Sequence, residues 1–510
     1  MKRKGLLSIL LIMFILLACN YQTILSPFRT STPTPTPASA GTPVSTTSIS
    51  TPEPPFNISW DDRSLFRQRL TASYQAVLDR LEGASIYHLA FSFSDPPTSI
   101  SGVEEVRYTN QEEVDLTEVD FAIYPEILGG SVKISKVLLD RQPISPLFSP
   151  GLMRILLSAP LKPGRSVIFY IEFAITVPTQ GSEPYFDIFG YHDGILSLAQ
   201  AYPTILVFNA QGWNNQTPNL EGDPLFSDTS FYLVSIDAPV DLTLVSSGVE
   251  VKRQRKAGRQ QVLYADGPAR DFYLAASTSF KKHSEKVGET TFNSYAPSSM
   301  DQAALSALKT AEAAIADFSI RYAVYPYTEF NIVPIVTSAG GVEFPGLTAV
   351  AENVYDQNDY LKAVVAHEVA HQWFYNMVGN ETQQQPWLDE SMAQFATCQY
   401  YLDTYGTQAE HSCLDSMLGR WDLLNDQKIP IGQAVSAYTS DEYGAIVYGR
   451  GPLFFQALRQ QIGQATFDSL MHDYVTSYAW NIATTDDFKK LAEQHCNCDL
   501  TPLFQEWVYP

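Results

Sequence analysis

Two histidines four positions apart, with a glutamate after the first, are the residues of this sequence best suited to catalysis. They lie in the segment HEVAH as His367, Glu368 and His371, within a stretch at 359–378 whose apolar spacing predicts one helix. Residues four apart share a helix face, so both imidazoles can bind one metal ion. Glu368 is then placed to accept a proton from a water molecule that the ion activates. Two histidines that only pack or form hydrogen bonds are the alternative for so short a pattern.

A third ligand candidate follows in the next helical segment. Hydrolytic zinc sites have three protein ligands and one open position for water. Glu390, in the segment WLDESMA, is separated from His371 by 18 residues, enough chain for a loop that brings a second helix alongside the first. A surface glutamate is the alternative for Glu390 taken alone. The spacing of the two segments together predicts a site for one Zn²⁺ ion formed by His367, His371 and Glu390.

These segments resemble the M1 (gluzincin) zinc aminopeptidases, whose pattern is HExxH, 18 residues and then Glu. Two further segments carry the resemblance. The first, GGVEFPG at 340–346, stands where the family has Gly-x-Met-Glu-Asn. The second, YGRG at 448–451, resembles the family's Tyr-x-Lys-Gly segment. The resemblance covers roughly residues 57–510, and it implies Glu368 as the general base and Tyr448 as hydrogen-bond donor to the developing oxyanion.

The same resemblance implies how a peptide would bind. Glu343 would pair with the free α-amine of the substrate, and Gln200, in SLAQA, resembles the β-domain Gln or Glu that helps to hold this amine. Gly340 and Gly341 would let the substrate backbone approach an edge strand and add to it. The alternatives are a solvated strand-edge carboxylate for Glu343 and an ordinary polar residue of the β-domain for Gln200.

The sequence departs from the family pattern at several positions. Val342 and Phe344 replace the family's Met and Asn, which changes the amine end of the pocket. Arg450 replaces Lys and so keeps the charge but not the geometry. We expect the chain to lack the family's large C-terminal helical domain, and the cleft to be more open as a result.

The elements that must position these residues fall into two halves, and the expected fold class is α+β. Residues 57–285 alternate with period two, as in Val167 to Val177, and predict an antiparallel β-domain. Residues 286–510 are mainly helical, with the patterns listed here: 301–319, 359–378, 387–405, 452–462 and 484–495. The resemblance implies a saddle-like β-domain followed by a thermolysin-like peptidase domain.

The first 56 residues predict a targeting signal followed by a tether. Residues 1–18 combine a basic start with an apolar run shorter than the about 20 residues that span a bilayer, which is typical of a signal peptide. The run ends in LLAC, which resembles a bacterial lipobox with Cys19 as the lipidated residue. An ordinary signal peptide or weak anchor is the alternative. Residues 19–56 are a Ser/Thr/Pro-rich tether, so we expect an extracytoplasmic, membrane-anchored lipoprotein.

Composition excludes other classes of function. The 33 Lys and Arg residues against 55 Asp and Glu give a net charge of −22, which argues against nucleic-acid binding. Besides Cys19, the cysteines are Cys398, Cys413, Cys496 and Cys498, which allow one or two disulfides whose pairing the sequence does not determine.

The sequence thus favours a zinc metallopeptidase, specifically an aminopeptidase that removes N-terminal residues from peptides outside the cytoplasm. Two other functions stay open. A thermolysin-like endopeptidase would use the same zinc chemistry and would accept substrates with a blocked N-terminus. A catalytically silent binding lipoprotein would use the β-domain to hold a partner, although the predicted ligands, base and tyrosine are all present.

Overall fold

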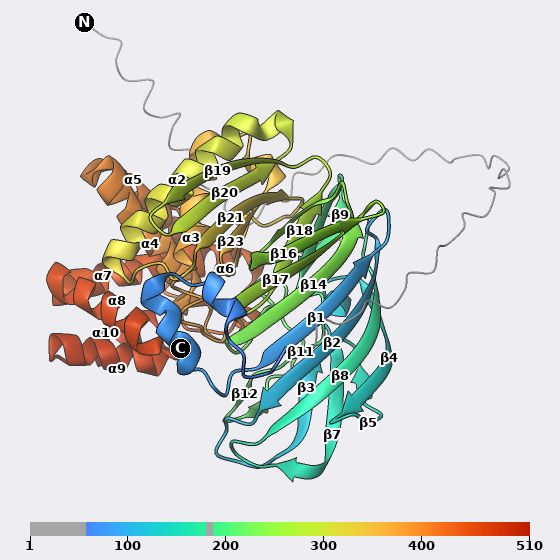
Figure 1. The fold of residues 1–510 in the computed structure, drawn as a ribbon. Helices are drawn as coiled ribbons and strands as arrows, with labels where there is room; N and C mark the ends of the chain where they lie inside the picture. Colours follow the sequence, from blue (N-terminus) through green and yellow to red (C-terminus); the bar gives the residue numbers. More distant parts are fainter. Residues whose placement is uncertain (1–57, 180–186) are drawn as a thin grey trace, which may run out of the picture.

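The computed structural model describes residues 58–179 and 187–510. The predicted signal segment and tether, Cys19 included, lie outside these residues. Among the described helices, none has the length and apolar character needed to cross a bilayer. Figure 1 shows the sheets of the N-terminal half on one side of the molecule and most helices on the other.

Three sheets form most of the N-terminal half. The largest has the strand order β16-β17-β14-β1-β2-β8-β4-β5. Its strands are β1 (Ile86–Phe93), β2 (Ser99–Thr109), β4 (Ser131–Leu139), β5 (Gln142–Pro143), β8 (Ser166–Thr176), β14 (Ser230–Pro239), β16 (Val249–Lys256) and β17 (Arg259–Ala269). Buried and more exposed residues alternate along most of β8, as its sequence predicts.

Two four-stranded sheets and a short ribbon complete this half. They have the orders β15-β18-β10-β9, β11-β3-β7-β6 and β12-β13. Their strands are β3 (Leu116–Ala122), β6 (Leu147–Ser149), β7 (Leu152–Leu161), β9 (Phe189–His192), β10 (Ile195–Ala199), β11 (Thr204–Ile205), β12 (Phe208–Asn209), β13 (Gly212–Trp213), β15 (Thr243–Ser246) and β18 (Tyr273–Ser277). The short helix α1 (Tyr124–Ile127) follows β3 in the chain.

One strand pair differs from the predicted antiparallel pattern. β1 and β14 run parallel at the centre of the large sheet. Parallel neighbours need a long crossover connection, and the strands β2 to β13 supply it. A pairing between such distant segments leaves no local trace in the sequence.

The second half builds helices around a five-stranded sheet of order β19-β20-β21-β23-β22. Its strands are β19 (Lys281–Val287), β20 (Thr290–Ala296), β21 (Glu329–Ile335), β22 (Gly341–Phe344) and β23 (Leu347–Ala351). Its helices are α2 (Asp301–Arg321), α3 (Asn358–Ala370), α4 (Glu390–Tyr405), α5 (Thr407–Asp422), α6 (Ser440–Ala445), the π-helical turn η7 (Ile446–Arg450), α7 (Gly451–Ile462), α8 (Gln464–Tyr478), α9 (Thr485–Cys496) and α10 (Thr501–Trp507).

The predicted domain boundary at 285/286 falls inside β19, which pairs with β20 in the sheet of the second half. The N-terminal segment crosses between the halves as well. Its two 3₁₀ helices, Leu65–Gln68 and Ala72–Asp79, bury Phe66 and Val77 in the core that also contains the apolar face of α2. The β-domain is therefore packed against the helical half from both ends of its chain.

The helix predicted at 359–378 ends earlier, at Ala370. Beyond it, the backbone N–H groups of Asn376, Met377 and Val378 donate to carbonyls five residues back. Bonds of this length widen the turn and end a regular α-helix. Long-range contacts stabilise this turn, because Arg270 of the β-domain donates to the carbonyls of Tyr375 and Asn481.

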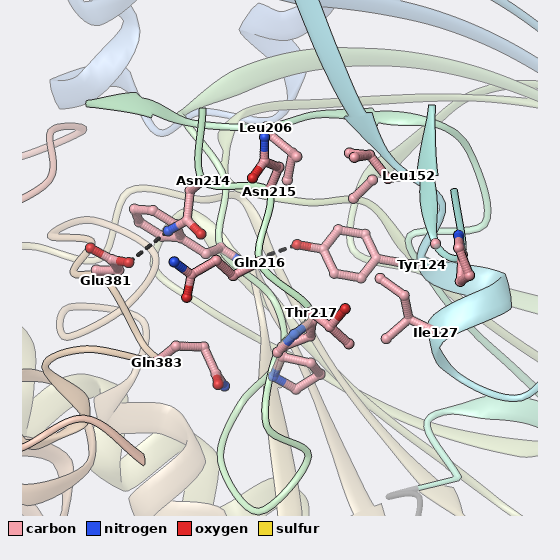
Figure 2. A pocket seen from close by; sticks show the side chains of 16 residues that line it. Tyr124, Ile127, Leu152, Leu206, Asn214, Asn215, Gln216, Thr217, Glu381 and Gln383 are labelled. Carbon is pink, nitrogen blue, oxygen red and sulfur yellow. Dashed lines mark hydrogen bonds between the residues drawn. The ribbon is translucent and has the colours of Figure 1, made fainter. Parts of the chain in front are cut away.

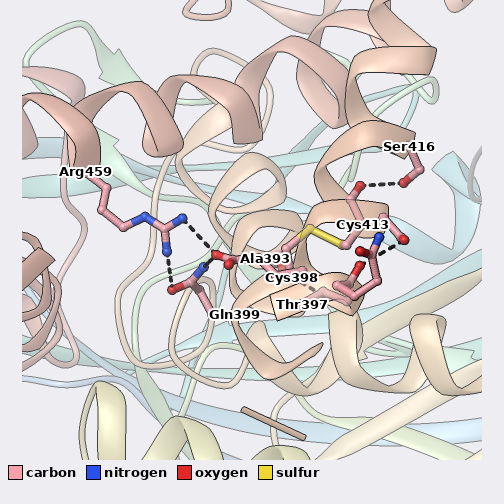
Figure 3. Close-up of a disulfide and its surroundings, with 10 residues drawn as sticks. Ala393, Thr397, Cys398, Gln399, Cys413, Ser416 and Arg459 are labelled. Carbon is pink, nitrogen blue, oxygen red and sulfur yellow. Dashed lines mark hydrogen bonds and ion pairs between the residues drawn. A yellow bond between two sulfur atoms is a disulfide. The ribbon is translucent and has the colours of Figure 1, made fainter. Parts of the chain in front are cut away.

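The described cysteines form two disulfides, Cys398–Cys413 and Cys496–Cys498. Figure 3 shows the first, which joins α4 to α5. Beside it, Arg459 of α7 donates to Gln399 at 2.9 Å. The bridge and this hydrogen bond fasten two helices, α5 and α7, to α4, the helix that begins with Glu390.

Arg69 is the buried residue that joins the two halves most directly. Its guanidinium is fully buried, pairs with Asp266 of β17 at 2.8 Å, and donates to the carbonyls of Glu329 and Pro345 at 3.1 Å each. It also lies over the ring of Tyr327, 3.6 Å from the centroid. Removing one partner of a buried ion pair leaves the other as an uncompensated buried charge.

We expect Arg69→Met to lower the free energy of unfolding by about 3–5 kcal/mol, because Asp266 would remain buried and unpaired. Urea denaturation followed by tryptophan fluorescence measures the change. The matched control is Arg67→Met, since Arg67 is exposed and its side chain hydrogen-bonds, within the described part of the chain, only to Gln75, at 3.4 Å. Equal effects of the two substitutions would contradict the role of the buried pair.

Candidate active site

Three predicted ligands meet where α3 ends and α4 begins. His367 lies in the last turn of α3, His371 caps its C-terminus, and Glu390 is the first residue of α4. His367 Nε2 lies 3.2 Å from both His371 Nε2 and Glu390 Oε2, and the last two atoms are 3.5 Å apart. A tetrahedral site with zinc–ligand distances of about 2.1 Å separates its ligand atoms by about 3.4 Å. The spacing of the three atoms therefore fits one zinc ion, and we call His367, His371 and Glu390 the metal cluster.

The surroundings of the two imidazoles also support their role, together with Glu390, as zinc ligands. His371 is 1% exposed, and its Nδ1 lies 2.9 Å from the carbonyl of Phe374, which directs Nε2 toward the cluster. Burial lowers the pKa of His371, but the carboxylates of Glu343 and Glu390 outweigh this effect and raise it well above the usual value. The cluster thus attracts positive charge, and two imidazoles with one carboxylate suit Zn²⁺.

Glu368 lies against strand β22. It is 4% exposed, and its carboxylate is near Glu343 and His371, with one ligand atom of each residue within 4.8 Å of the others. Burial, and then the charge of Glu343, raise the pKa of Glu368 well above its ordinary value. A Cβ atom at Gly341 would lie 2.6 Å from Glu368 Oε1, so a larger residue here would require Glu368 or the strand to shift.

Tyr448 projects from a short π-helical turn, η7, rather than from a regular helix. It is 5% exposed and lines the cavity at the metal cluster, with its ring centroid 6.1 Å from that of His367. Such turns often occur at functional sites, because the wider turn changes the direction of the side chains. Tyr443 packs edge-on against Tyr448, with centroids 5.7 Å apart.

Arg450, which stands where the family has Lys, makes contacts that stabilise the fold. Its guanidinium donates to the carbonyls of Ile429, Glu506 and Trp507 at 2.7–2.9 Å. Burial lowers the pKa of Arg450 to about 10. The side chain fastens the C-terminal segment to η7 and does not line the cavity at the metal cluster.

Glu343 lies on β22, the edge strand of the five-stranded sheet. It is 7% exposed, and its Oε1 atom is buried with no hydrogen-bond partner among the described residues. Gly340 and Gly341 line the same cavity, at the start of this strand. The predicted amine ligand and the predicted strand-addition edge therefore lie directly beside the metal cluster.

Gln200 lies elsewhere. It is fully buried in the β-domain, where its amide donates to Ser227 Oγ and accepts from Thr204 Oγ1. It does not line the cavities next to the cluster. Its contact with a substrate amine stays a prediction.

Two residues that line the site were not predicted from the sequence. Asp223, in a loop of the β-domain, lines the cavity beside Glu343, and Arg420 of α5 lines the cavity at the metal cluster. Neither stands in a recognisable motif. Only the fold brings residues so far apart in sequence to the ligands.

Comparisons with known proteins agree with this geometry. Residues 306–507 match the model of the peptidase family M1 domain. Human aminopeptidase RNPEPL1 is 28% identical over 213 residues, which are 37% of this chain and 28% of that protein. Human aminopeptidase B is 30% identical over 162 residues, or 29% of this chain and 24% of that protein. The matches thus span less than a third of these relatives' length.

Solved structures match over a larger part of the chain. The M1 zinc metallopeptidase from Deinococcus radiodurans is similar with a TM-score of 0.62 at 17% identity, over 84% of this chain and 92% of that one. A mutant of that protein bound to a Tyr-Ser-Ala substrate gives 0.62 at 16% identity, over 83% and 93%. At this identity the likeness supports the α+β two-domain fold.

Fold and site together define an α+β protein whose three candidate zinc ligands lie where α3 ends and α4 begins. The match of residues 306–507 to the peptidase family M1 domain confirms the resemblance recognised in the sequence motifs.

Gly341→Ala should move Glu368 or β22, because the new Cβ atom would overlap the carboxylate. Misplacing a reacting group by about 1 Å costs on the order of 100-fold in rate, so we expect a loss of that size in kcat/KM for peptide hydrolysis. Zinc content and melting temperature check that the fold persists. Gly419→Ala is the control, since a Cβ atom there would meet open space outside the backbone of its own helix. An unchanged kcat/KM in Gly341→Ala would contradict the tight contact.

Proposed function

We propose that the protein is a zinc aminopeptidase that removes N-terminal residues from peptides. The observation that carries the proposal is the position of Glu343. Its buried carboxylate, with one unpaired oxygen, lies next to Glu368 and His371. A buried carboxylate is costly without a partner, and the free α-ammonium group of a peptide supplies one.

Each step of the proposed reaction has a residue in place. A bound zinc ion would polarise the scissile carbonyl and lower the pKa of water toward about 7. Glu368 takes the proton of the attacking water and passes it to the leaving amine. Tyr448 donates a hydrogen bond to the oxyanion that develops on the carbonyl. Glu343 fixes the distance from the amine to the bond that is cleaved.

The other two functions are less well supported. An endopeptidase must let the substrate continue past the residue before the cleaved bond, yet Glu343 and the loop containing Asp223 line this side of the site. A silent binding protein would have no need for the base, the tyrosine and three ligands in matching geometry.

We further propose that the protein acts outside the cytoplasm, attached to a membrane through a lipid on Cys19. The basic, apolar and LLAC segments of residues 1–19 support this proposal. Mass spectrometry of the mature N-terminus tests it: a diacylglyceryl group on Cys19 is expected, and a chain that keeps residues 1–18 would overturn it.

The test of activity uses the purified protein with aminoacyl fluorogenic amides, free or N-acetylated, with and without a zinc chelator. We expect cleavage of the free amides only, and its loss with chelator. Glu343→Gln should raise KM for free amides about tenfold or more, because a charge-assisted contact is lost.

Two outcomes would oppose this proposal. Equal cleavage of acetylated substrates would point to the endopeptidase. No cleavage of any substrate by zinc-loaded protein would favour the binding protein, and Glu368→Gln would then leave the biological role intact.

A further inference from the structure

A second cavity opens beside the metal cluster on its β-domain side, and we call it the acidic pocket. It shares Gly341, Glu343, Glu390 and Tyr448 with the cavity at the cluster, so the two are continuous. Four of its lining residues are carboxylates, namely Glu221, Asp223, Glu343 and Glu390, and among the residues that the structure describes no lysine, arginine or histidine lines it. The acidic pocket is therefore more negative than the cavity at the metal cluster, which Arg420 lines.

Two of the four carboxylates already have partners in the proposed reaction. Glu390 is a metal ligand and Glu343 holds the α-ammonium group. Asp223 is left without a counter-charge: its Oδ1 accepts from the backbone N–H of Leu225 at 3.0 Å, while its Oδ2 is buried with no hydrogen-bond partner. Burial and the nearby Glu343 raise the pKa of Asp223 well above its usual value. A cation in the pocket would stabilise the ionised carboxylate.

The loop that carries Asp223 is held rigidly by the catalytic half. The carbonyl of Asp223 accepts from Gln383 Nε2 at 2.7 Å and from Thr382 Oγ1 at 3.1 Å. Figure 2 shows Glu381 and Gln383 of this half beside Asn214 and Thr217 of the β-domain, with a hydrogen bond from Asn214 to Glu381. Gly222 packs against Tyr443, where an added Cβ would lie 3.0 Å from the hydroxyl oxygen. Asp223 is therefore fixed in place before any ligand binds.

The remaining wall of the pocket is apolar, with Ile188, Pro224, Ala339 and Val342. Lysine and arginine side chains combine an apolar stem with a charged end, and such a wall suits the stem. The pocket also adjoins Glu343, so the residue whose amine pairs with Glu343 is the one whose side chain can enter it.

We infer that the acidic pocket binds the side chain of the substrate's N-terminal residue, and that Asp223 selects lysine or arginine there. The inference rests on the proposed aminopeptidase function and specifies its substrate class. Glu221, which is exposed at the same pocket, adds negative charge at its mouth.

The test compares arginine and citrulline amides, because citrulline has nearly the shape of arginine without its charge. The wild-type protein should prefer the arginine amide by about tenfold or more in kcat/KM, and Asp223→Asn should remove most of this preference while citrulline hydrolysis changes less than about twofold. Asp228→Asn is the matched control, since Asp228 is exposed and does not line the pocket.

Other results would overturn the inference. Equal losses for both amides in Asp223→Asn would assign Asp223 to the α-ammonium group or to the loop, and no loss would remove it from binding. If Asp223→Asn does not fold, inhibition of wild-type alanine amide hydrolysis by arginine amide and by citrulline amide decides, with equal inhibition contradicting the inference. If the wild-type protein cleaves no amide, the proposed function fails; calorimetric binding of the two amides then decides the selectivity by itself.

Discussion

Buried charge is the constraint on which this structure depends. Glu343, Glu368 and Glu390 are each at most 8% exposed and lie around His371, so three carboxylates share one desolvated site. Positive charge among them would relieve their mutual repulsion and let them stay ionised while buried. One zinc ion and one substrate ammonium group together carry the matching charge. The same electrostatic argument thus links the metal cluster to the proposed binding of a free amine at Glu343.

The fold must hold these charges in place against their repulsion. α3 and α4 supply the ligands, β22 crosses directly over Glu368, and the disulfide between α4 and α5 fastens the helix that begins with Glu390. The β-domain contributes through two buried arginines, since Arg69 binds the carbonyl just after β22 and Arg270 binds the turn after α3. Through these two contacts the β-domain, which supplies no metal ligand itself, helps to fix the geometry of the site.

Local patterns in the sequence predicted the parts of the site that depend on local structure. His367 and His371 share a helix face because of their spacing, and the need for a third ligand at a suitable spacing identified Glu390. Motif resemblance identified Glu343 and Tyr448. Contacts between distant segments could not be predicted from local patterns. The helix that carries the histidines ends at Ala370, because Arg270 and the wide turn stabilise a non-helical backbone after it. The parallel pairing of β1 with β14 is a second example. Asp223 was missed for the same reason, since its loop carries no motif.

Metal analysis of the purified full-length protein tests the central claim most directly. The account predicts one zinc ion per chain in the wild-type protein, and loss of that zinc in Glu390→Gln with the fold retained by circular dichroism. Glu352→Gln, outside the cluster, should keep its zinc. A folded wild-type protein that binds no zinc, or a Glu390→Gln variant that binds it as tightly as the wild type, would contradict the account.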